Sequence, residues 1–291
     1  MPDGEGVPST VDELRMRVGQ ALAAAGVEDP AVDAELLIGH VLGLSRGQVQ
    51  SRAITRAAVA TADAARVLEL AARRARREPQ QHITGVAHFR SLELQVGPGV
   101  FVPRPETEHV AQLAIDALGA APGDAPVAVD LGTGSGALAL ALATEVPHAR
   151  VHAVEVSPAA HAWTARNVAR IAPRVDLVLG DLADAFPELD GTVSVVVSNP
   201  PYIPVDAVPR DPEVRLHDPA LALYGGTDGL DVVRLVSATA RRLLHPGGAL
   251  VIEHGELQGD AIRALLDADG WRATATHQDL TRRDRATTAV R

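Results

Sequence analysis

Cysteine and lysine are both absent from this chain of 291 residues. Without cysteine there can be no disulfide bond, no thiolate metal site and no cysteine nucleophile. Without lysine there is no P-loop side chain to bind the phosphates of a nucleotide, so phosphoryl transfer is not expected. Aromatic residues make up only 2% of the chain.

Long apolar runs and an excess of basic charge are also missing. No run is long enough to span a bilayer, and residues 1–6 are acidic with no apolar stretch behind them, unlike a signal peptide. We therefore expect a soluble cytoplasmic protein. The net charge of −10 argues against broad binding to nucleic acid phosphates. No grouping of His, Asp and Glu has the spacing of metal ligands, so we expect no metal.

The first part of the chain has the periodicity of helices. Apolar residues three and four positions apart predict one helix after Thr10, a second after Asp29 and a third over residues 61–77. Residues 1–80 are therefore predicted to form a small helical bundle as an N-terminal domain. Residues 81–104 change to an alternating pattern, with strands at 88–96 and 100–102 around a turn at 97–99. This pattern predicts a β-hairpin that links two domains.

Residues 105–291 alternate between short β-branched runs and helical stretches. Such alternation predicts an α/β domain with a doubly wound, mostly parallel sheet. The predicted strands number seven and lie near residues 127–131, 151–155, 175–179, 193–198, 249–253, 271–275 and 286–290.

A stiff polar turn, Asn199-Pro200-Pro201-Tyr202, follows the fourth predicted strand. Proline cannot donate to a β-ladder, so the strand has to end here. The carboxyl ends of strands are where open α/β sheets bind ligands. The turn offers an amide, carbonyls that are not tied up in the sheet and an aromatic ring, which together could accept both hydrogens of a planar NH2 group. A proline-rich loop without chemistry is the alternative.

Two further groups follow other strands of the same sheet. Gly132-Thr133-Gly134-Ser135-Gly136 lets a ligand approach the backbone closely, and Glu155 ends the next strand, where a carboxylate can accept both hydroxyls of a ribose. Asp181 ends the third strand and could bind an adenine amino group, with Leu182 as an apolar wall. An ordinary turn aspartate is nearly as good an interpretation of Asp181.

Together Asp130-Leu131 with the glycine loop, Glu155 and the Asn-Pro-Pro-Tyr turn resemble class I, Rossmann-like S-adenosylmethionine-dependent methyltransferases that act on an amide or amino nitrogen. Further stretches, spread over nearly the whole chain, resemble the peptide chain release factor glutamine N5-methyltransferase family. They are Glu78-Pro79-Gln80-Gln81-His82-Ile83-Thr84-Gly85, Phe101-Val102-Pro103-Arg104-Pro105-Glu106-Thr107-Glu108, Glu253-His254-Gly255 with Gln258-Gly259, and Asp279-Leu280 with Arg283-Asp284-Arg285.

The resemblance implies methyl transfer from S-adenosylmethionine to the side-chain amide of the Gln in the Gly-Gly-Gln motif of class 1 release factors, which modulates translation termination. The residues from Gly132 to Gly136 with Glu155, Asp181 and Leu182 would bind the cofactor, and Asn199 would lie near its methionine part. Some family members carry Trp where this chain has Leu182. The N-terminal domain would dock the release factor.

For the reaction itself we predict that the Asn199 side-chain oxygen and the Pro200 carbonyl accept the two hydrogens of the substrate amide, while Pro201 and Tyr202 complete the substrate site. Glu253 and His254 are predicted to be architectural. Three different functions remain open besides this one: a ribosomal-protein glutamine methyltransferase, a DNA adenine N6-methyltransferase, and a non-catalytic cofactor-binding module that docks on translation factors.

Overall fold

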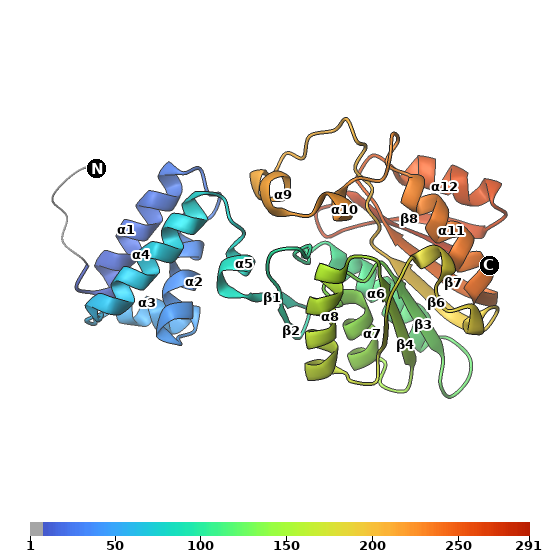
Figure 1. Ribbon diagram of the computed structural model, residues 1–291, viewed down its shortest axis with the longest axis horizontal. Helices are drawn as coiled ribbons and strands as arrows, with labels where there is room; N and C mark the ends of the chain where they lie inside the picture. The colour runs from blue at the N-terminus through green and yellow to red at the C-terminus, as the bar shows by residue number, and fades with distance from the viewer. Residues whose placement is uncertain (1–7) are drawn as a thin grey trace. The chain divides into compact units, whose positions relative to one another are not determined.

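The computed structural model describes residues 8–291 (Figure 1). Residues 1–6, in which we expect no signal peptide, lie outside the described part. The chain forms two compact units. One runs up to Gly85 and includes Arg210–His217, and the other contains Val86–Pro209 and Asp218–Arg291. Our division into functional domains at residues 80 and 104 stays a prediction.

The first unit is built from helices around one apolar cluster. Leu14 and Leu22 of the first helix and Leu37 of the second are fully buried in it. One helix was not predicted because its sequence is polar, but it begins with a capping box between Ser45 and Gln48. The helices of the unit are α1 Val11–Ala24, α2 Pro30–Leu42, α3 Arg46–Ile54, α4 Thr61–Ala75, α5 Gln80–Thr84 and α9 Pro212–His217.

Helix α9 is attached to this unit by ion pairs although it is far away in sequence. Glu213 accepts hydrogen bonds from Arg74 at 2.5 Å and from Arg77 at 2.6 Å, and Arg74 also pairs with Asp33 at 2.6 Å. Burial alone would raise the pKa of Glu213, but hydrogen bonds from neighbours that include both arginines hold it well below its usual range. Glu213 is therefore ionised at neutral pH.

The second unit contains a seven-stranded sheet, which confirms the predicted fold class. The strand order is β5-β4-β3-β6-β7-β9-β8, and the first five strands in this order are parallel. Strand β9 alone is reversed, since it runs antiparallel to both of its neighbours, β7 and β8. The strands are β3 Val127–Leu131, β4 Arg150–Glu155, β5 Asp176–Leu179, β6 Val193–Ser198, β7 Leu244–Glu253, β8 Arg272–Gln278 and β9 Asp284–Val290.

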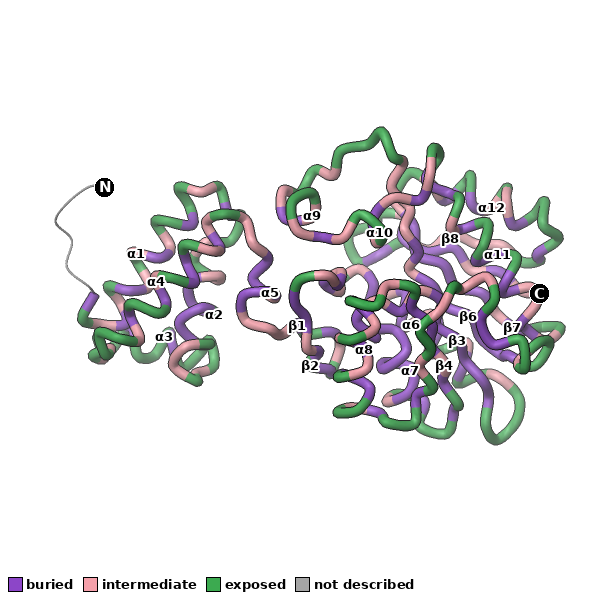
Figure 2. Tube along the Cα trace, in the orientation of Figure 1, coloured by how far each residue is buried: buried purple, intermediate pink, exposed green. Residues whose placement is uncertain are grey.

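Successive residues of the central strands enter two different apolar layers. On β3, Ala128 belongs to one core cluster, whereas Val127, Val129 and Leu131 belong to the other. Both β3 and β6 are buried along their whole length (Figure 2). The helices on the first face are α6 Thr107–Gly119, α7 Ala137–Glu145 and α8 Pro158–Ile171. The helices on the second face are α11 Asp231–Leu243 and α12 Gly259–Ala268. The unit also contains three short helices, η1 Leu182–Asp184, η2 Pro187–Leu189 and α10 Ala220–Leu223.

The hairpin turns at a different place from the one we predicted. Strand β1 Val86–Phe89 pairs with β2 Leu92–Gln95, so the turn is Arg90-Ser91 and residues 100–102 form no strand. Arg90 has a φ of 53°, which few residues other than glycine adopt. Contacts from distant residues stabilise it: its N–H donates to Glu108 at 2.8 Å, and its guanidinium binds Glu145. Tertiary contacts therefore place this turn.

We expect Glu213→Gln to loosen α9. The substitution keeps the shape but removes the charge that both arginines bind, and a hydrogen bond to a charged group contributes about 1.5–3 kcal/mol. Amide hydrogen exchange in residues 212–217 should become at least about tenfold faster, as measured by mass spectrometry. Glu188→Gln, at an exposed carboxylate, is the control and should leave that exchange unchanged. Because the folded-state pKa of Glu213 is lowered, the wild type should lose the same protection as the pH falls below about 4.

Candidate active site

The predicted site residues follow strands that end at one level of the sheet. In the pairing register Leu131 lies beside Val154, and Ser198 lies beside Ile252. The Ser198 hydroxyl donates to the Leu131 carbonyl at 2.6 Å, which joins the ends of β6 and β3. The chain order reverses between these two strands, since β4 and β5 lie on one side of β3 and β6 and β7 on the other. Such a reversal opens a ligand crevice in α/β sheets.

The glycine loop after β3 leaves open space where a ligand can approach. Gly132 and Gly134 have positive φ angles of 77° and 60°, and a Cβ added to either would meet no atom within 4 Å. The N–H groups of Gly132 and Thr133 both donate to the Val154 carbonyl at 3.0 Å. Gly136 is different, because a Cβ there would lie 2.9 Å from the Thr164 side chain. The first two glycines thus keep the loop accessible, and the third permits close packing of α7 and α8.

Glu155 is bound directly to the glycine loop. One carboxylate oxygen accepts from the Gly134 N–H at 2.8 Å, and the other accepts from the Ser157 N–H at 2.8 Å. Each carboxylate oxygen can accept about two hydrogen bonds, so Glu155 keeps acceptor capacity for ribose hydroxyls. The loop and this acid, which the sequence suggested as partners, therefore form one connected structure.

Asp130, the residue before the end of β3, has a role that we did not predict. One of its oxygens accepts from the Thr133 hydroxyl at 2.6 Å and from the Ala139 N–H at 3.1 Å, so it ties the loop to the start of α7. Its Oδ1 is buried with no hydrogen-bond partner among residues 8–291. Complete burial raises the pKa of Asp130 to about 7. The sequence singled it out only as part of the motif that carries the family resemblance, without a role.

Asp181 and Leu182 lie next to Glu155 but make local contacts. The Gly180 N–H donates to the Glu155 carbonyl at 3.0 Å. Asp181 accepts from the Ala183 N–H at 2.9 Å and caps the short helix η1. Leu182 is half-buried and packs against the apolar cluster on the α11 face of the sheet. The turn interpretation thus describes what Asp181 does here, and its contact with an adenine stays a prediction.

The Asn-Pro-Pro-Tyr turn is fixed by a second glycine segment, residues 225–229, which we did not predict. A Cβ on Gly225 would lie 2.4 Å from the Pro201 carbonyl oxygen, and one on Gly229 would lie 2.3 Å from the Tyr202 carbonyl oxygen. Both positions therefore need glycine. The repeated glycines of Gly-Gly-Thr-Asp-Gly were the available signal.

Tyr202 is also fixed by Gln258, a residue that the sequence singles out only through the family resemblance. Gln258 donates from Nε2 to the Tyr202 carbonyl at 2.9 Å and accepts the Gly255 N–H on Oε1 at 3.0 Å. Burial, followed by the charge of Glu253, raises the pKa of the Tyr202 phenol, so the phenol is neutral at ordinary pH. Among the described residues, no backbone N–H donates a hydrogen bond to the Pro200 carbonyl.

The prediction that His254 is architectural agrees with its contacts. Its ring is fully buried, with Nε2 2.9 Å from the Thr287 hydroxyl and Nδ1 2.9 Å from the Gly255 carbonyl. Burial lowers the pKa of His254, so the ring is neutral. A neutral ring with both nitrogens engaged is not available to a substrate.

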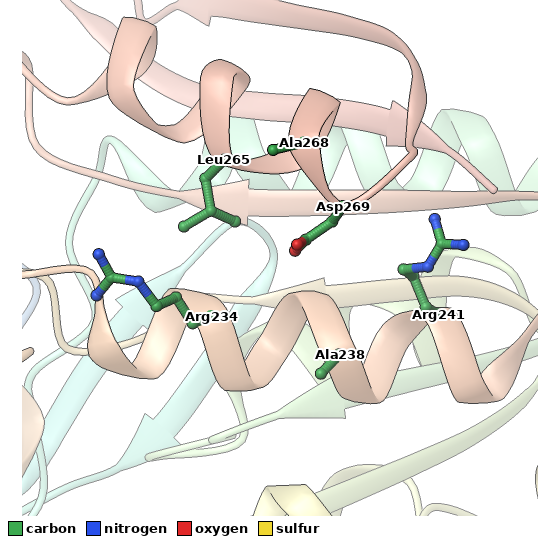
Figure 3. Close-up of a pocket in the computed structure, with 6 residues that line it drawn as sticks. All are labelled: Arg234, Ala238, Arg241, Leu265, Ala268 and Asp269. Carbon is green, nitrogen blue, oxygen red and sulfur yellow. The ribbon is translucent and has the colours of Figure 1, made fainter.

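One surface pocket lies away from these residues, between α11 and α12 (Figure 3). Its lining includes none of the predicted site residues and consists of Arg234, Ala238, Arg241, Leu265, Ala268 and Asp269. Over residues 8–291 we find neither a cluster of three His, Asp or Glu side chains suited to a metal nor a helix with the length and apolarity to cross a membrane.

Comparison with known proteins gives two family matches. Residues 13–85 match the PrmC N-terminal domain, and residues 91–210 match the methyltransferase small domain. Among solved structures, a 16S rRNA N2 G1207 methyltransferase of T. thermophilus, in complex with AdoMet and guanosine, has a TM-score of 0.52 and 22% identity. The match covers 71% of this chain and 49% of that one, and it supports the fold alone.

Curated relatives match over almost the whole chain. A release factor glutamine methyltransferase of Streptomyces coelicolor is 54% identical over 273 residues, which is 93% of this chain and 94% of that protein. A 4-amino-L-phenylalanine/4-methylamino-L-phenylalanine methyltransferase of Streptomyces pristinaespiralis is 40% identical over 98% of this chain and 96% of that protein. The first match confirms the family resemblance, and the chain belongs to the release factor glutamine methyltransferase family.

Proposed function

We propose that this protein transfers a methyl group from S-adenosylmethionine to the side-chain amide nitrogen of the Gln in the Gly-Gly-Gln motif of class 1 peptide chain release factors. The observation that carries the proposal is the position of the glycine loop, Glu155 and the Asn199 turn on adjoining strand ends of one sheet. The relative that is 54% identical bears the name of this activity.

The residues after β3 and β4 fit the cofactor. The open space beside Gly132 and Gly134 admits a ligand close to the backbone, and the Glu155 carboxylate has acceptor capacity for a ribose. Asp181 and Leu182 would line the adenine, and Asn199 would lie near the methionine part. When bound, S-adenosylmethionine supplies an electrophilic methyl group on a sulfonium.

The protein has to position the substrate amide nitrogen, which is a poor nucleophile. The lone pair of an amide nitrogen is delocalised, and the amide is barely acidic, so a base cannot easily activate it beforehand. The Asn199 oxygen and the Pro200 carbonyl would accept the two N–H groups, orient the nitrogen and stabilise the positive charge that develops on it. Orienting two bound reactants can lower the barrier by roughly 7–11 kcal/mol.

Tyr202 would cover the substrate amide and exclude water. Its phenol stays neutral because burial raises its pKa, so it does not serve as the base. The proton would leave to solvent after transfer. The helical N-terminal domain, residues 1–80, would dock the release factor, and its match to the PrmC N-terminal domain supports this assignment.

A second candidate substrate is a small aromatic amine. It is favoured by the 40% identity to a methyltransferase named for 4-amino-L-phenylalanine. An aniline also presents a planar NH2 group, which the two proposed acceptors could hold. A glutamine of a ribosomal protein and an adenine of DNA carry a planar amide or amino group as well, so both belong in the same test.

The direct test uses labelled S-adenosylmethionine and an unmodified class 1 release factor, with the product mapped by mass spectrometry. We expect one methyl group on the Gln of Gly-Gly-Gln and none on a factor whose motif is Gly-Gly-Ala. Parallel reactions contain 4-amino-L-phenylalanine, ribosomal proteins or duplex DNA. Faster turnover of any of these than of the factor would replace the proposed substrate.

Asn199→Ala should reduce kcat by about 100- to 1,000-fold, the typical cost of removing one preorganised polar group at a reacting centre. The cofactor site rests mainly on the glycine loop and Glu155, so cofactor affinity measured by calorimetry should change much less. A mainly cofactor-binding defect, with kcat preserved, would count against the assigned role.

Gly229→Ala should also lower kcat, because its Cβ would lie 2.3 Å from the Tyr202 carbonyl oxygen and would have to displace the turn. Gly123→Ala is the matched control: it has a φ of 95°, but nothing lies within 4 Å of its Cβ. Both substitutions strain the backbone by about 1 kcal/mol, which thermal denaturation measures. Equal losses of kcat in the two variants would show that strain alone, not displacement of the turn, explains the effect.

A further inference from the structure

Glu253 lies beside the proposed reacting group and has no role in the mechanism derived so far. It is the last residue of β7, and Ile252 before it is paired with Ser198 of β6. Glu253 and Asn199 are therefore the next residues on two neighbouring parallel strands. Glu253 is only 1% exposed, so its carboxyl group is buried at this edge of the sheet.

The carboxyl group of Glu253 has few hydrogen-bond partners, although it is deeply buried. Its Oε2 and the Thr107 Oγ1 are each buried without a well-aligned hydrogen-bond partner in the described chain. The side chains of Thr107 and Asn199 are nevertheless close enough to lower the pKa of this carboxyl group. The nearby Arg285 does not form an ion pair with it, since its guanidinium binds Asp279 and the His254 carbonyl. A buried carboxyl without an ion pair is costly to retain, which suggests a function.

We propose that Glu253 is a positioning residue that sets the direction of the Asn199 side-chain amide. The inference rests on the proposed function, in which the Asn199 oxygen must face the substrate amide. The two ends of an Asn amide have nearly the same shape, and only their hydrogen-bond partners distinguish them. An ionised carboxylate accepts hydrogen bonds only, so the NH2 end of Asn199 faces Glu253 and the oxygen faces the substrate.

Protonation of Glu253 would remove its preference for the NH2 end of the Asn199 amide. A neutral carboxyl can also donate, so it can bind the Asn199 oxygen and turn the NH2 end towards the substrate, where two donors would oppose each other. The ionised form is therefore the active one. Burial raises the pKa of Glu253 to about 8, with a further contribution from the charge of Glu106, whereas Thr107, Arg285 and Asn199 act to lower it.

Other titratable groups near this turn come from every element that packs on it. They are Arg104 and Glu106 before α6, His109 on α6, Tyr202 after β6, His254 after β7, His277 on β8 and Arg285 on β9. Burial keeps the His254 ring and the Tyr202 phenol neutral, so a pH-dependent rise in kcat/KM that Glu253→Gln abolishes is assigned to Glu253.

The test measures kcat, KM and the pH profile of the full-length enzyme with a release factor and S-adenosylmethionine. For the wild type, kcat/KM should rise with pH towards a plateau above about 8. Glu253→Gln, which has the same shape but cannot select one end of Asn199, should lower kcat by roughly 10- to 100-fold. Its KM for the factor should change less than about twofold, and the rise with pH should disappear.

Glu145→Gln is the matched control. Glu145 is also a glutamate of the same unit, but it pairs with Arg90 at the far end of α7, so kcat and the pH profile should match the wild type. Unchanged kcat together with an unchanged pH profile in Glu253→Gln would overturn the proposal.

A second variant keeps the test decisive if Glu253→Gln is unstable. Thr107→Val removes a hydroxyl that lowers the pKa of Glu253, so the rise in kcat/KM should move to higher pH by roughly half a unit or more. A purely structural role predicts no such shift, and its absence would overturn the inference. The wild-type reaction separates the two proposals: without methylation of the factor both fall, whereas with it only the role of Glu253 is in question.

Discussion

The site depends on one constraint, which is that β3 and β6 end side by side where the order of the strands reverses. The Ser198 hydroxyl joins the two ends by binding the Leu131 carbonyl. Because both strands are buried along their whole length, apolar packing on two faces fixes their register, and a shift by one residue would turn every side chain to the opposite face. The fixed register also fixes the positions of the loop after β3 and of the turn after β6, although neither belongs to the sheet.

Three buried acids lie along this edge, and their partners differ in a regular way. Glu155 has both oxygens bound by backbone N–H groups, Asp130 has one oxygen satisfied, and Glu253 is the least satisfied. Burial therefore raises the pKa of Asp130 to about 7 and that of Glu253 to about 8. The Glu155 carboxylate, which is bound to the glycine loop, has both oxygens engaged, whereas the role proposed for Glu253 requires an acceptor that faces Asn199.

The sequence predicted what depends on local pattern and missed what depends on distant contacts. The strands, the glycine loop and Glu155 follow from apolar runs and glycine spacing. The turn at Arg90 was missed because its positive φ is stabilised by Glu108 and Glu145, which no local pattern indicates. Gly229 was missed for the same reason, since its need for glycine arises from the Tyr202 carbonyl. The sequence predicts only an architectural role for Glu253, because it does not tell which groups surround a strand end.

The proposed chemistry recognises an NH2 group rather than a glutamine. Two acceptors in a stiff turn and a carboxylate that orients one of them would serve any planar amide or amine. The family agrees with this view, because relatives of similar length carry names that refer to a release factor and to an aromatic amino acid. Selection between such substrates must then come from outside the turn, through surfaces that bring the correct NH2 group to it. If residues 1–80 dock the substrate, as we propose, the reaction centre and the docking surface could change independently, and one fold could serve substrates of very different size.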